Sequence, residues 1–296
     1  MLETVETLIA KLIDEVDYPP AAHLFQKLSG GKRLRARLIL TIAPESAQAP
    51  LLGAIVELIH AASLLHDDVI DEAQLRRGVP SVNATEGSKT AIMLGDILYS
   101  KAFSELTSFD PRIARSVAES VTRLSVGEMM DVGMAERFNS DRELYLKMLY
   151  LKTATLIEAC AYSAAILAGK DEEAYAIYGK NLGLAFQIVD DILDITADEA
   201  TLGKPSLNDF SEGKATLPYI DLYNNLDENE KTRLIANHAK VLDDAEKGWI
   251  RSKMDAFGTI EQSYSYARAL CDEAIGAIGD DAALRAIIET VIKRSY

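Results

Sequence analysis

The sequence predicts an all-α fold, a single helical bundle over residues 1–296. Apolar residues recur at intervals of three and four between Leu2 and Val16, and the same spacing continues through nearly every later segment, as one face of a helix requires. The alternation of apolar and polar residues that is typical of strands is not sustained anywhere in the sequence. Without a repeat, a low-complexity tract or a linker, one domain is the simplest organisation.

Start and stop signals set the boundaries of the predicted helices. The eight prolines lie between periodic segments or at their beginnings, where they do not break a helix. Residues 140–143, Ser-Asp-Arg-Glu, form a capping-box pattern that predicts a helix running to Gly169, and Asp171 is expected to cap a further helix to about Ile195. Loops are expected at 73–86, 134–139 and 198–213.

Composition narrows the classes of function. The chain carries 31 Lys and Arg against 46 Asp and Glu, a formal charge of −15, which argues against a nucleic-acid partner or an anionic-membrane surface. No apolar run approaches the ~20 residues of a membrane span, so no transmembrane segment is expected, and residues 1–16 lack the basic-then-apolar order of a signal peptide. Cys160 and Cys271 stand far apart, which suits a reducing compartment. We therefore expect a cytoplasmic protein.

Two aspartate clusters carry the strongest chemical signal. The first, Asp67-Asp68-Val69-Ile70-Asp71, ends an apolar helix and puts Asp67 and Asp71 one turn apart on the same face. Carboxylates this close repel each other and are costly to desolvate unless a cation binds them. One such cluster is also compatible with a solvated helix end that binds nothing.

The second cluster, Asp190-Asp191-Ile192-Leu193-Asp194, repeats the spacing at the end of another apolar helix. Two copies favour a shared site for Mg²⁺, because this ion binds a few carboxylates and completes its shell with water and the phosphate oxygens of a substrate. If the two helix ends meet, Asp67, Asp71 and Asp190 would face one another across the mouth of a cavity. The candidate metal ligands are Asp67, Asp68, Asp71, Asp190, Asp191 and Asp194.

Cations are concentrated at a few places in this acidic chain. Residues 30–37, Gly-Gly-Lys-Arg-Leu-Arg-Ala-Arg, place four of them where a glycine loop enters a helix, whose first amides also attract anions. This pattern predicts a phosphate pocket, with a solvated basic turn as the alternative. Arg76 and Arg77 directly follow the first aspartate cluster, where guanidinium groups could bind phosphate beside the metal.

Three lysines give weaker signals. Lys152-Thr153 lies inside the apolar helix predicted for 140–169, which requires a counter-ion for the ammonium group or a stem that reaches the surface, and a plain surface lysine is the alternative. Lys204 and Lys214 follow the second aspartate cluster and suit a lid that closes on a leaving group.

His60 lies nearly two turns before Asp67 on the same helix face, so it is expected to face the same cavity, with a hydrogen-bonded core histidine as the alternative. Glu57 and His60 also match the Glu-x-x-His pattern of di-iron helical bundles. Such sites need the pattern twice, and none of the other three histidines has Glu three residues earlier. The di-iron interpretation is therefore rejected.

Taken together and in this order, the motifs resemble the trans-type polyprenyl diphosphate synthases, a family with the isoprenoid synthase type I fold. The resemblance covers about residues 30–220 and rests on residues 30–35, 67–78, 152–153, 186–194 and 213–218. It implies a bundle around a deep central cavity and a usually homodimeric enzyme. It also implies Mg²⁺-dependent, head-to-tail condensation of isopentenyl diphosphate with an allylic diphosphate, farnesyl diphosphate being the expected primer, to an all-trans polyprenyl diphosphate. Ala36 replaces the proline usual in the family, but the cations around it are intact.

The resemblance also implies residue roles. Isopentenyl diphosphate would be held by Gly31, Lys32, Arg35, His60 and Arg77. The allylic diphosphate would be held by Arg76, Lys152, Thr153, Gln187, Lys204 and Lys214. Catalytic contributions are expected from Lys152, Thr153, Gln187, Asp67, Asp71 and Asp190. The aspartates would carry three Mg²⁺, for which Mn²⁺ could substitute, and the cationic groups would stabilise the departing diphosphate while the allylic C–O bond ionises.

Small residues in the first aspartate helix predict a long product. Ala62 and Ser63 stand at positions by which the family sets chain length, one turn before Asp67, and bulky aromatics there stop growth early. Gly127-Glu128 also resembles long-chain members. We expect a product of about C30 to C40, such as octaprenyl diphosphate, with a short-chain farnesyl or geranylgeranyl product as the alternative. Candidates for the floor of the tail channel are Met93, Phe103 and Met129.

Two rival functions share parts of this pattern. A terpene cyclase has no need of the second diphosphate pocket implied by Lys32, Arg35 and Arg77. A non-catalytic partner subunit of a prenyltransferase typically loses its metal aspartates, whereas both clusters are complete here. The complete set of motifs therefore favours an active enzyme.

Overall fold

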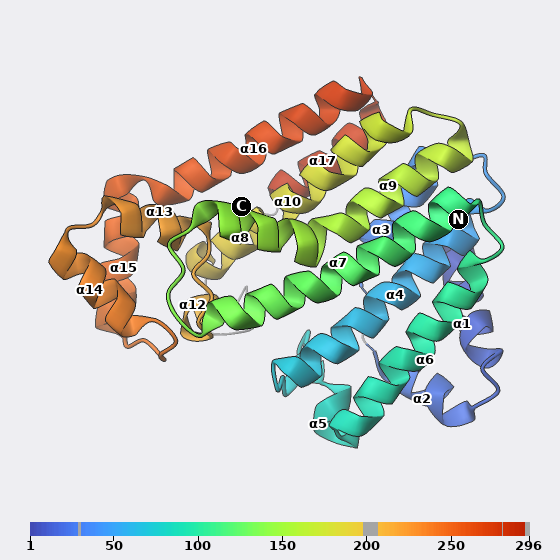
Figure 1. Cartoon of the computed structure of the whole chain (residues 1–296), viewed down its shortest axis with the longest axis horizontal. Helices are drawn as coiled ribbons and strands as arrows, with labels where there is room; N and C mark the ends of the chain where they lie inside the picture. Colours follow the sequence, from blue (N-terminus) through green and yellow to red (C-terminus); the bar gives the residue numbers. More distant parts are fainter. Residues whose placement is uncertain (29–30, 198–206, 280, 294–296) are drawn as a thin grey trace. The chain divides into compact units, whose positions relative to one another are not determined.

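The computed structural model describes residues 1–28, 31–197, 207–279 and 281–293, and within these ranges the chain is helical apart from short connections and one minimal hairpin (Figure 1). The all-α prediction is therefore confirmed. The elements are α1 (Leu2–Asp14), α2 (Pro19–Lys27), α3 (Leu34–Ile42), α4 (Ala49–Ile70), β1 (Leu75–Arg76), β2 (Val79–Pro80), α5 (Val82–Glu86), α6 (Ser88–Leu106), α7 (Pro111–Ala135), α8 (Arg142–Leu149), the π-helical turn η1 (Tyr150–Ala154), α9 (Thr155–Ala168), α10 (Glu172–Thr196), α12 (Asn208–Ser211), α13 (Leu217–Asn225), α14 (Glu228–Asn237), α15 (Asp244–Phe257), α16 (Thr259–Ile278) and α17 (Ala282–Ile292).

The chain groups into two compact units. The first unit comprises residues 1–121 and 158–176, and the second comprises residues 122–157 and 177–296. The chain passes from one unit to the other within α7, α9 and α10. The organisation as one domain over residues 1–296 stays a prediction.

Helix α4 is the core of the first unit. It packs against α1, α3, α5 and α6, and all of its residues from Leu52 to Ile59 are buried. Gly53 allows α3 to approach, because a Cβ at this position would lie 3.3 Å from the Cβ of Ala36. The apolar helix therefore buries its length and leaves its last turn, with the first aspartate cluster, at the end of the packed region.

One long helical segment of the second unit starts at a different cap from the one predicted. Asp141, not Ser140, is the N-cap, since its Oδ1 accepts hydrogen bonds from the backbone amides of Glu143 and Leu144. A carboxylate at this position can satisfy two of the free amides of the first turn and carries a charge that the helix dipole favours. The segment then runs through η1 to Ala168, where Gly169 ends it with a φ of 63°.

Asp171 caps α10, which ends at Thr196, one residue beyond the predicted end. Two of the predicted loops differ from the structure. Of the loop expected at 198–213, residues 198–206 lie outside the described residues, and Asn208–Ser211 form the short helix α12. Residues 73–86 were expected to form a loop, but they contain the β1–β2 hairpin and the short helix α5. The hydroxyl of Ser81 accepts from the amide of Ala84 and starts α5, a local capping contact that hydrophobic periodicity does not reveal.

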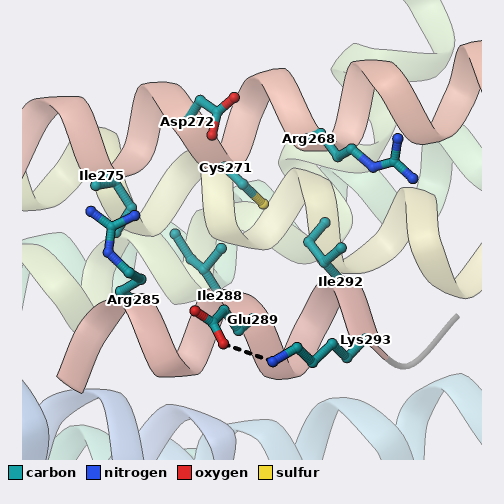
Figure 2. Close-up of a pocket in the computed structure, with 9 residues that line it drawn as sticks. All are labelled: Arg268, Cys271, Asp272, Ile275, Arg285, Ile288, Glu289, Ile292 and Lys293. Atoms are coloured by element: carbon teal, nitrogen blue, oxygen red, sulfur yellow. Dashed lines mark hydrogen bonds and ion pairs between the residues drawn. The ribbon is translucent and has the colours of Figure 1, made fainter. Parts of the chain in front are cut away.

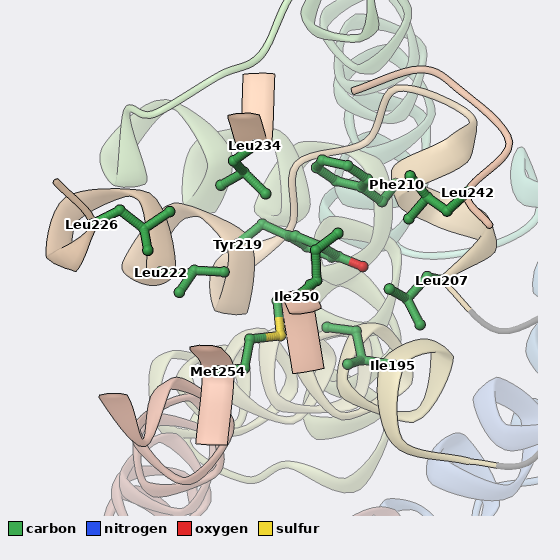
Figure 3. Packing of buried hydrophobic residues seen from close by; sticks show 10 residues of the cluster. All are labelled: Ile195, Leu207, Phe210, Tyr219, Leu222, Leu226, Leu234, Leu242, Ile250 and Met254. Atoms are coloured by element: carbon green, nitrogen blue, oxygen red, sulfur yellow. The ribbon is translucent and has the colours of Figure 1, made fainter. Parts of the chain in front are cut away.

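A cluster of buried apolar side chains holds the later helices of the second unit together (Figure 3). Phe210 stacks on Tyr219 at a ring distance of 4.4 Å, and both are fully buried. The cluster consists of Ile195, Leu207, Phe210, Tyr219, Leu222, Leu226, Leu234, Leu242, Ile250 and Met254. It therefore anchors residues 207–211 against the end of α10.

Two helical segments are long and apolar enough to cross a bilayer by length and composition alone, contrary to the sequence expectation that no run approaches that length. They are Ala49–Ile70 and Arg142–Ala168. The most apolar windows are 67% and 56% buried within the protein, so packing in a protein core also accounts for their character.

Candidate active site

The three carboxylates of the first aspartate cluster differ in solvent exposure and in hydrogen bonding. The amide of Asp71 donates to the carbonyl of Asp67 at 2.8 Å, which confirms the one-turn spacing. Asp71 is exposed and Asp67 partly exposed, whereas Asp68 is buried and pairs with Arg76 at 2.6 Å. Burial raises the pKa of Asp68, although the guanidinium group of Arg76 opposes this. The structure therefore leaves Asp67 and Asp71 as the accessible carboxylates and gives Arg76 a carboxylate partner.

The first unit also contains a group of residues that we call the cationic cradle: Gly31, Lys32, Arg35, His60 and Arg77. A Cβ on Gly31 would lie 3.0 Å from a guanidinium nitrogen of Arg77, so this glycine allows Arg77 to pack against the loop. Nε of Arg35 and Nδ1 of His60 are buried and make no hydrogen bond within the described ranges. Buried polar atoms are normally paired, so these two are candidates to receive a ligand. Lys32 is exposed.

The cradle keeps His60 neutral. Burial lowers the pKa of His60 well below its ordinary value, and the nearby guanidinium groups of Arg35 and Arg77 lower it further. A neutral imidazole can donate one hydrogen bond and accept another. The positive charge of the cradle therefore comes from its arginines and from Lys32, and not from His60.

Glu57 supports this cradle from α4, a role not found from the sequence. Its buried carboxylate accepts a hydrogen bond from the amide of Ala36 at 3.1 Å and pairs with Arg33 at 3.5 Å. Arg33 also pairs with Glu6 at 2.7 Å. The only sequence signal for this role was the position of Glu57 within an apolar helix, three residues before His60. The sequence analysis considered Glu57 only as part of the di-iron pattern, which was rejected.

The second aspartate cluster shows the same division between exposed and buried carboxylates. Asp190 is exposed, whereas Asp191 and Asp194 are buried. Asp191 accepts hydrogen bonds from the amide group of Gln187 at 3.0 Å and from the hydroxyl of Tyr145, and Asp194 accepts from the backbone amide of Asp209 at 3.1 Å. The two buried aspartates thus bind groups of their own unit.

Lys152 and Thr153 project from the π-helical turn η1. The ammonium group of Lys152 lies 2.5 Å from Asp131 and 2.9 Å from Glu128, so the counter-ion that the sequence required is present twice. Burial lowers the pKa of Lys152, but the two carboxylates outweigh it and raise the pKa above its ordinary value. Thr153 donates to the side-chain oxygen of Gln187 at 3.2 Å.

Two residues that the sequence did not identify, Tyr145 and Asp131, contact predicted site residues, and Asp131 does so through Lys152. Thr153, Gln187 and Asp191 form a chain of hydrogen bonds that continues to Tyr145 of α8. Tyr145 lies seven residues before Lys152, nearly two helical turns, and Asp131 lies one turn after Gly127. These spacings are the only sequence signals for Tyr145 and Asp131.

The carboxylates fit a divalent cation that shares its ligands with a substrate. Within the described ranges, no group of three or more His, Cys, Asp or Glu side chains lies close enough to hold a metal ion by itself. Accessible oxygen donors one turn apart, as in Asp67 and Asp71, suit Mg²⁺, which is usually bound through one or two carboxylates together with phosphate oxygens.

The remaining predicted residues have varied environments. Ala62 and Ser63 are buried in α4, and the hydroxyl of Ser63 donates to the carbonyl of His60 at 2.9 Å. Lys214 pairs with Glu212 at 2.9 Å, and Lys204 lies outside the described residues.

The candidates for the channel floor differ in burial. Met93 and Met129 are 56% and 76% exposed, which disfavours them as parts of an interior wall. Phe103 is partly buried and stacks on Tyr99 at 6.0 Å. Phe103 therefore stays a candidate.

A pocket of about 280 Å³ lies between α16 and α17 (Figure 2). Its lining consists of Arg268, Cys271, Asp272, Ile275, Arg285, Ile288, Glu289, Ile292 and Lys293. It contains none of the predicted site residues, and its charged side chains lie at an exposed rim. It is therefore not the diphosphate site that the motifs predict.

Comparison with known proteins bears on the whole chain. The family model described as polyprenyl synthetase matches residues 18–251. The crystal structure of octaprenyl pyrophosphate synthase from Helicobacter pylori superposes with a TM-score of 0.94, at 42% identity, covering 100% of this chain and 98% of that one. The octaprenyl diphosphate synthase of Escherichia coli is 34% identical, over 84% of this chain and 80% of that protein. A short chain isoprenyl diphosphate synthase of Methanothermobacter thermautotrophicus is 36% identical, over 79% of this chain and 75% of that protein.

Proposed function

The chain belongs to the polyprenyl synthetase family and is a prenyltransferase, and we propose that it condenses isopentenyl diphosphate head to tail with an allylic diphosphate in a Mg²⁺-dependent reaction that yields an all-trans polyprenyl diphosphate. The observation that carries the proposal is that each aspartate-rich helix end combines accessible carboxylates with buried ones that are bonded within their unit. An arrangement of this kind holds accessible carboxylates ready for a cation.

The cradle of the first unit is proposed to bind isopentenyl diphosphate. Arg35, Arg77 and Lys32 supply positive charge, and the neutral His60 supplies a hydrogen bond. Glu57 holds the backbone at Ala36 and so fixes the start of α3, on which Arg35 lies. A fixed cradle binds the diphosphate with its reactive double bond in a set direction.

The π-helical turn and its neighbours are proposed to bind the allylic diphosphate. Lys152 donates a hydrogen bond to Asp131 and forms an ion pair with Glu128, and an ammonium group has three N–H donors, so a donor is available for a phosphate oxygen. The carbonyl side of the Gln187 amide is fixed toward Thr153, because its NH₂ side donates to Asp191. Arg76, Lys204 and Lys214 are proposed as further cationic groups.

Asp67, Asp71 and Asp190 are the proposed metal ligands. Bound Mg²⁺ would supply positive charge that stabilises the departing diphosphate. Asp68, Asp191 and Asp194 would act behind these ligands, since each is buried and has at least one oxygen bonded within its own unit.

A long product of about C30 to C40 is proposed. Ala62 and Ser63 are small and buried one turn or more before Asp67, and the Helicobacter pylori octaprenyl pyrophosphate synthase is similar over the full chain. The short-chain relative at 36% identity keeps a farnesyl or geranylgeranyl product as the alternative. Product analysis by carbon number separates the two.

A cytoplasmic homodimer is proposed as the working form. On α7, Val126, Met129 and Val132 recur every three residues and are 46%, 76% and 49% exposed, an apolar surface that a second copy would cover. Met129→Glu should shift the sedimentation coefficient toward that of the monomer. An unchanged coefficient would place the interface elsewhere.

The proposed reaction is tested by incubating the protein with farnesyl diphosphate, radiolabelled isopentenyl diphosphate and Mg²⁺. Asp67→Ala and Asp190→Ala should each lower kcat by roughly 10³-fold or more, because removal of the groups that stabilise a leaving anion costs several kcal/mol. Asp255→Ala, on the exposed face of α15, is the matched control and should keep wild-type activity. Near-wild-type turnover of the two cluster variants at saturating Mg²⁺ would overturn the metal assignment.

A further inference from the structure

The π-helical turn Tyr150–Ala154 is in direct backbone contact with two glycines of the same unit. A Cβ on Gly127 of α7 would lie 2.3 Å from the backbone nitrogen of Lys152 and 2.7 Å from its Cα. A Cβ on Gly183 of α10 would lie 2.6 Å from the Cα of Ala154 and 2.8 Å from its Cβ. Since backbone atoms cannot rotate away as the end of a side chain can, no larger residue fits either position unless the turn moves.

The geometry of a π-helical turn explains why room is needed here. Such a turn holds one residue more than an α-helical turn, so its backbone bulges outward, and turns of this kind are frequent at functional sites. A glycine inside a helix costs about 0.5–1 kcal/mol relative to alanine. The chain accepts this cost at Gly127 and at Gly183, on the two helices that meet the bulge.

Each glycine lies one helical turn before a residue that binds a side chain of η1. Asp131, four residues after Gly127, pairs with the ammonium group of Lys152 at 2.5 Å. Gln187, four residues after Gly183, accepts the hydroxyl hydrogen of Thr153 at 3.2 Å. Residues four apart share a helix face. Helices α7 and α10 therefore each contact the backbone of η1 through a glycine, and each contact a side chain of η1 through the residue one helical turn later.

We propose that Gly127 and Gly183 are positioning residues, which set the depth of the π-helical turn so that Lys152 and Thr153 reach the allylic diphosphate. Neither glycine touches substrate. Each acts through the backbone of η1, and the pairing of Lys152 and Thr153 with α7 and α10 follows from the depth that the glycines allow. The inference rests on the proposed function of these two side chains.

The size of the effect follows from the contact distances. With alanine at position 127, the backbone nitrogen of Lys152 would have to retreat from 2.3 Å to at least the 3.4 Å of ordinary contact. A displacement of about 1 Å at a binding group can cost on the order of 10²-fold in rate. We expect a 10- to 100-fold loss of kcat for Gly127→Ala, and a smaller loss for Gly183→Ala, whose closest contact is 2.6 Å.

The experiment compares Gly127→Ala and Gly183→Ala with Gly248→Ala. Gly248 lies within α15, and a Cβ added there would meet no atom within 4 Å, so its substitution changes helix propensity alone. The measurements are kcat, KM for each substrate, the thermal midpoint, and the calorimetric affinity for farnesyl thiolodiphosphate, an analogue that resists ionisation. The expected result is a lower kcat and an analogue affinity at least about tenfold weaker for the two variants. The KM for isopentenyl diphosphate should stay near the wild-type value, because its cradle lies in the first unit.

A second variant covers the case in which the alanine variants do not fold. Asp131→Asn keeps the size of the side chain but removes a charge that holds Lys152, and it should lower kcat roughly tenfold without changing the KM for isopentenyl diphosphate. Folded variants with wild-type kcat and analogue affinity would overturn the proposal. So would an Asp131→Asn enzyme with wild-type kcat. A wild-type protein without prenyl transfer would instead refute the proposed function, and the analogue affinities would still test the positioning.

Discussion

Tyr145→Phe removes one hydroxyl group from the hydrogen-bond chain that reaches Thr153. Tyr145 is 1% exposed and donates to the carboxylate of Asp191, itself 5% exposed, which also accepts from Gln187. Without the hydroxyl, one oxygen of this buried carboxylate loses its partner. Burial raises the pKa of Asp191 well above its ordinary value, so no extra cost for a charged acceptor is added to the about 1–3 kcal/mol that an unsatisfied buried group costs. We therefore expect a loss of about 2 kcal/mol in the free energy of unfolding.

The chain contains a matched control for this substitution. Tyr219 lies in the same unit and is equally buried, but its hydroxyl has no hydrogen-bond partner within the described part of the chain. Tyr219→Phe should leave stability unchanged or raise it, because a buried unsatisfied hydroxyl is lost. Urea denaturation followed by circular dichroism measures both changes, and steady-state assays should show a lower kcat for Tyr145→Phe alone. Equal stability changes for the two variants would refute the reasoning.

Three further substitutions test other parts of the account. Ser63→Phe should shorten the product by placing an aromatic ring one turn before the first aspartate cluster, and an unchanged product distribution by chromatography would remove Ser63 from the tail channel. Glu57→Gln should raise the KM for isopentenyl diphosphate several-fold with a smaller change for the allylic substrate, because the carboxylate holds the amide of Ala36 and pairs with Arg33; equal changes in both KM values would contradict this. The pKa of His60 in the folded chain is held well below 6.5, the value expected in the unfolded chain. As the pH falls through 6.5, the unfolded chain therefore binds more protons than the folded chain. The free energy of unfolding then decreases by at most about 1.4 kcal/mol per pH unit. His60→Gln should lose this part of the slope in denaturation curves between pH 7 and pH 5.5, and identical slopes would show that His60 does not contribute.

The sequence predicted the helices because they are encoded in local spacing, and the same spacing singled out the two aspartate clusters as candidate sites. Apolar intervals of three and four identify a helix face whatever that face packs against. The spacing of Asp67 and Asp71 places both on one side of α4, and the structure confirms it. The requirement that Lys152 have a counter-ion also follows from one residue in an apolar segment, and the structure satisfies it with Asp131 and Glu128.

The sequence did not predict which carboxylates of the two aspartate clusters are exposed and which are paired, because this depends on contacts with residues outside each cluster. Asp68 pairs with Arg76, which the β1–β2 hairpin brings back to it. Asp191 is buried and accepts a hydrogen bond from Tyr145, 46 positions earlier. No pattern of neighbouring residues predicts either contact.

The π-helical turn was not predictable for a similar reason. Its five residues, Tyr-Leu-Lys-Thr-Ala, have no feature that separates them from an ordinary helical turn, and their spacing predicted one continuous helix. What distinguishes the turn is the space left by Gly127 and Gly183 on two other helices. A glycine in a helix signals a close approach only when the approaching segment is known.

The most direct test of the proposed mechanism is a crystal structure of the protein grown with MgCl₂, farnesyl thiolodiphosphate and isopentenyl diphosphate. We expect a thiolodiphosphate group whose oxygens share magnesium ions with the carboxylates of Asp67, Asp71 and Asp190, beside the ammonium group of Lys152. Electron density for the analogue bound to only one of the two aspartate clusters, with the other cluster free of metal, would contradict it.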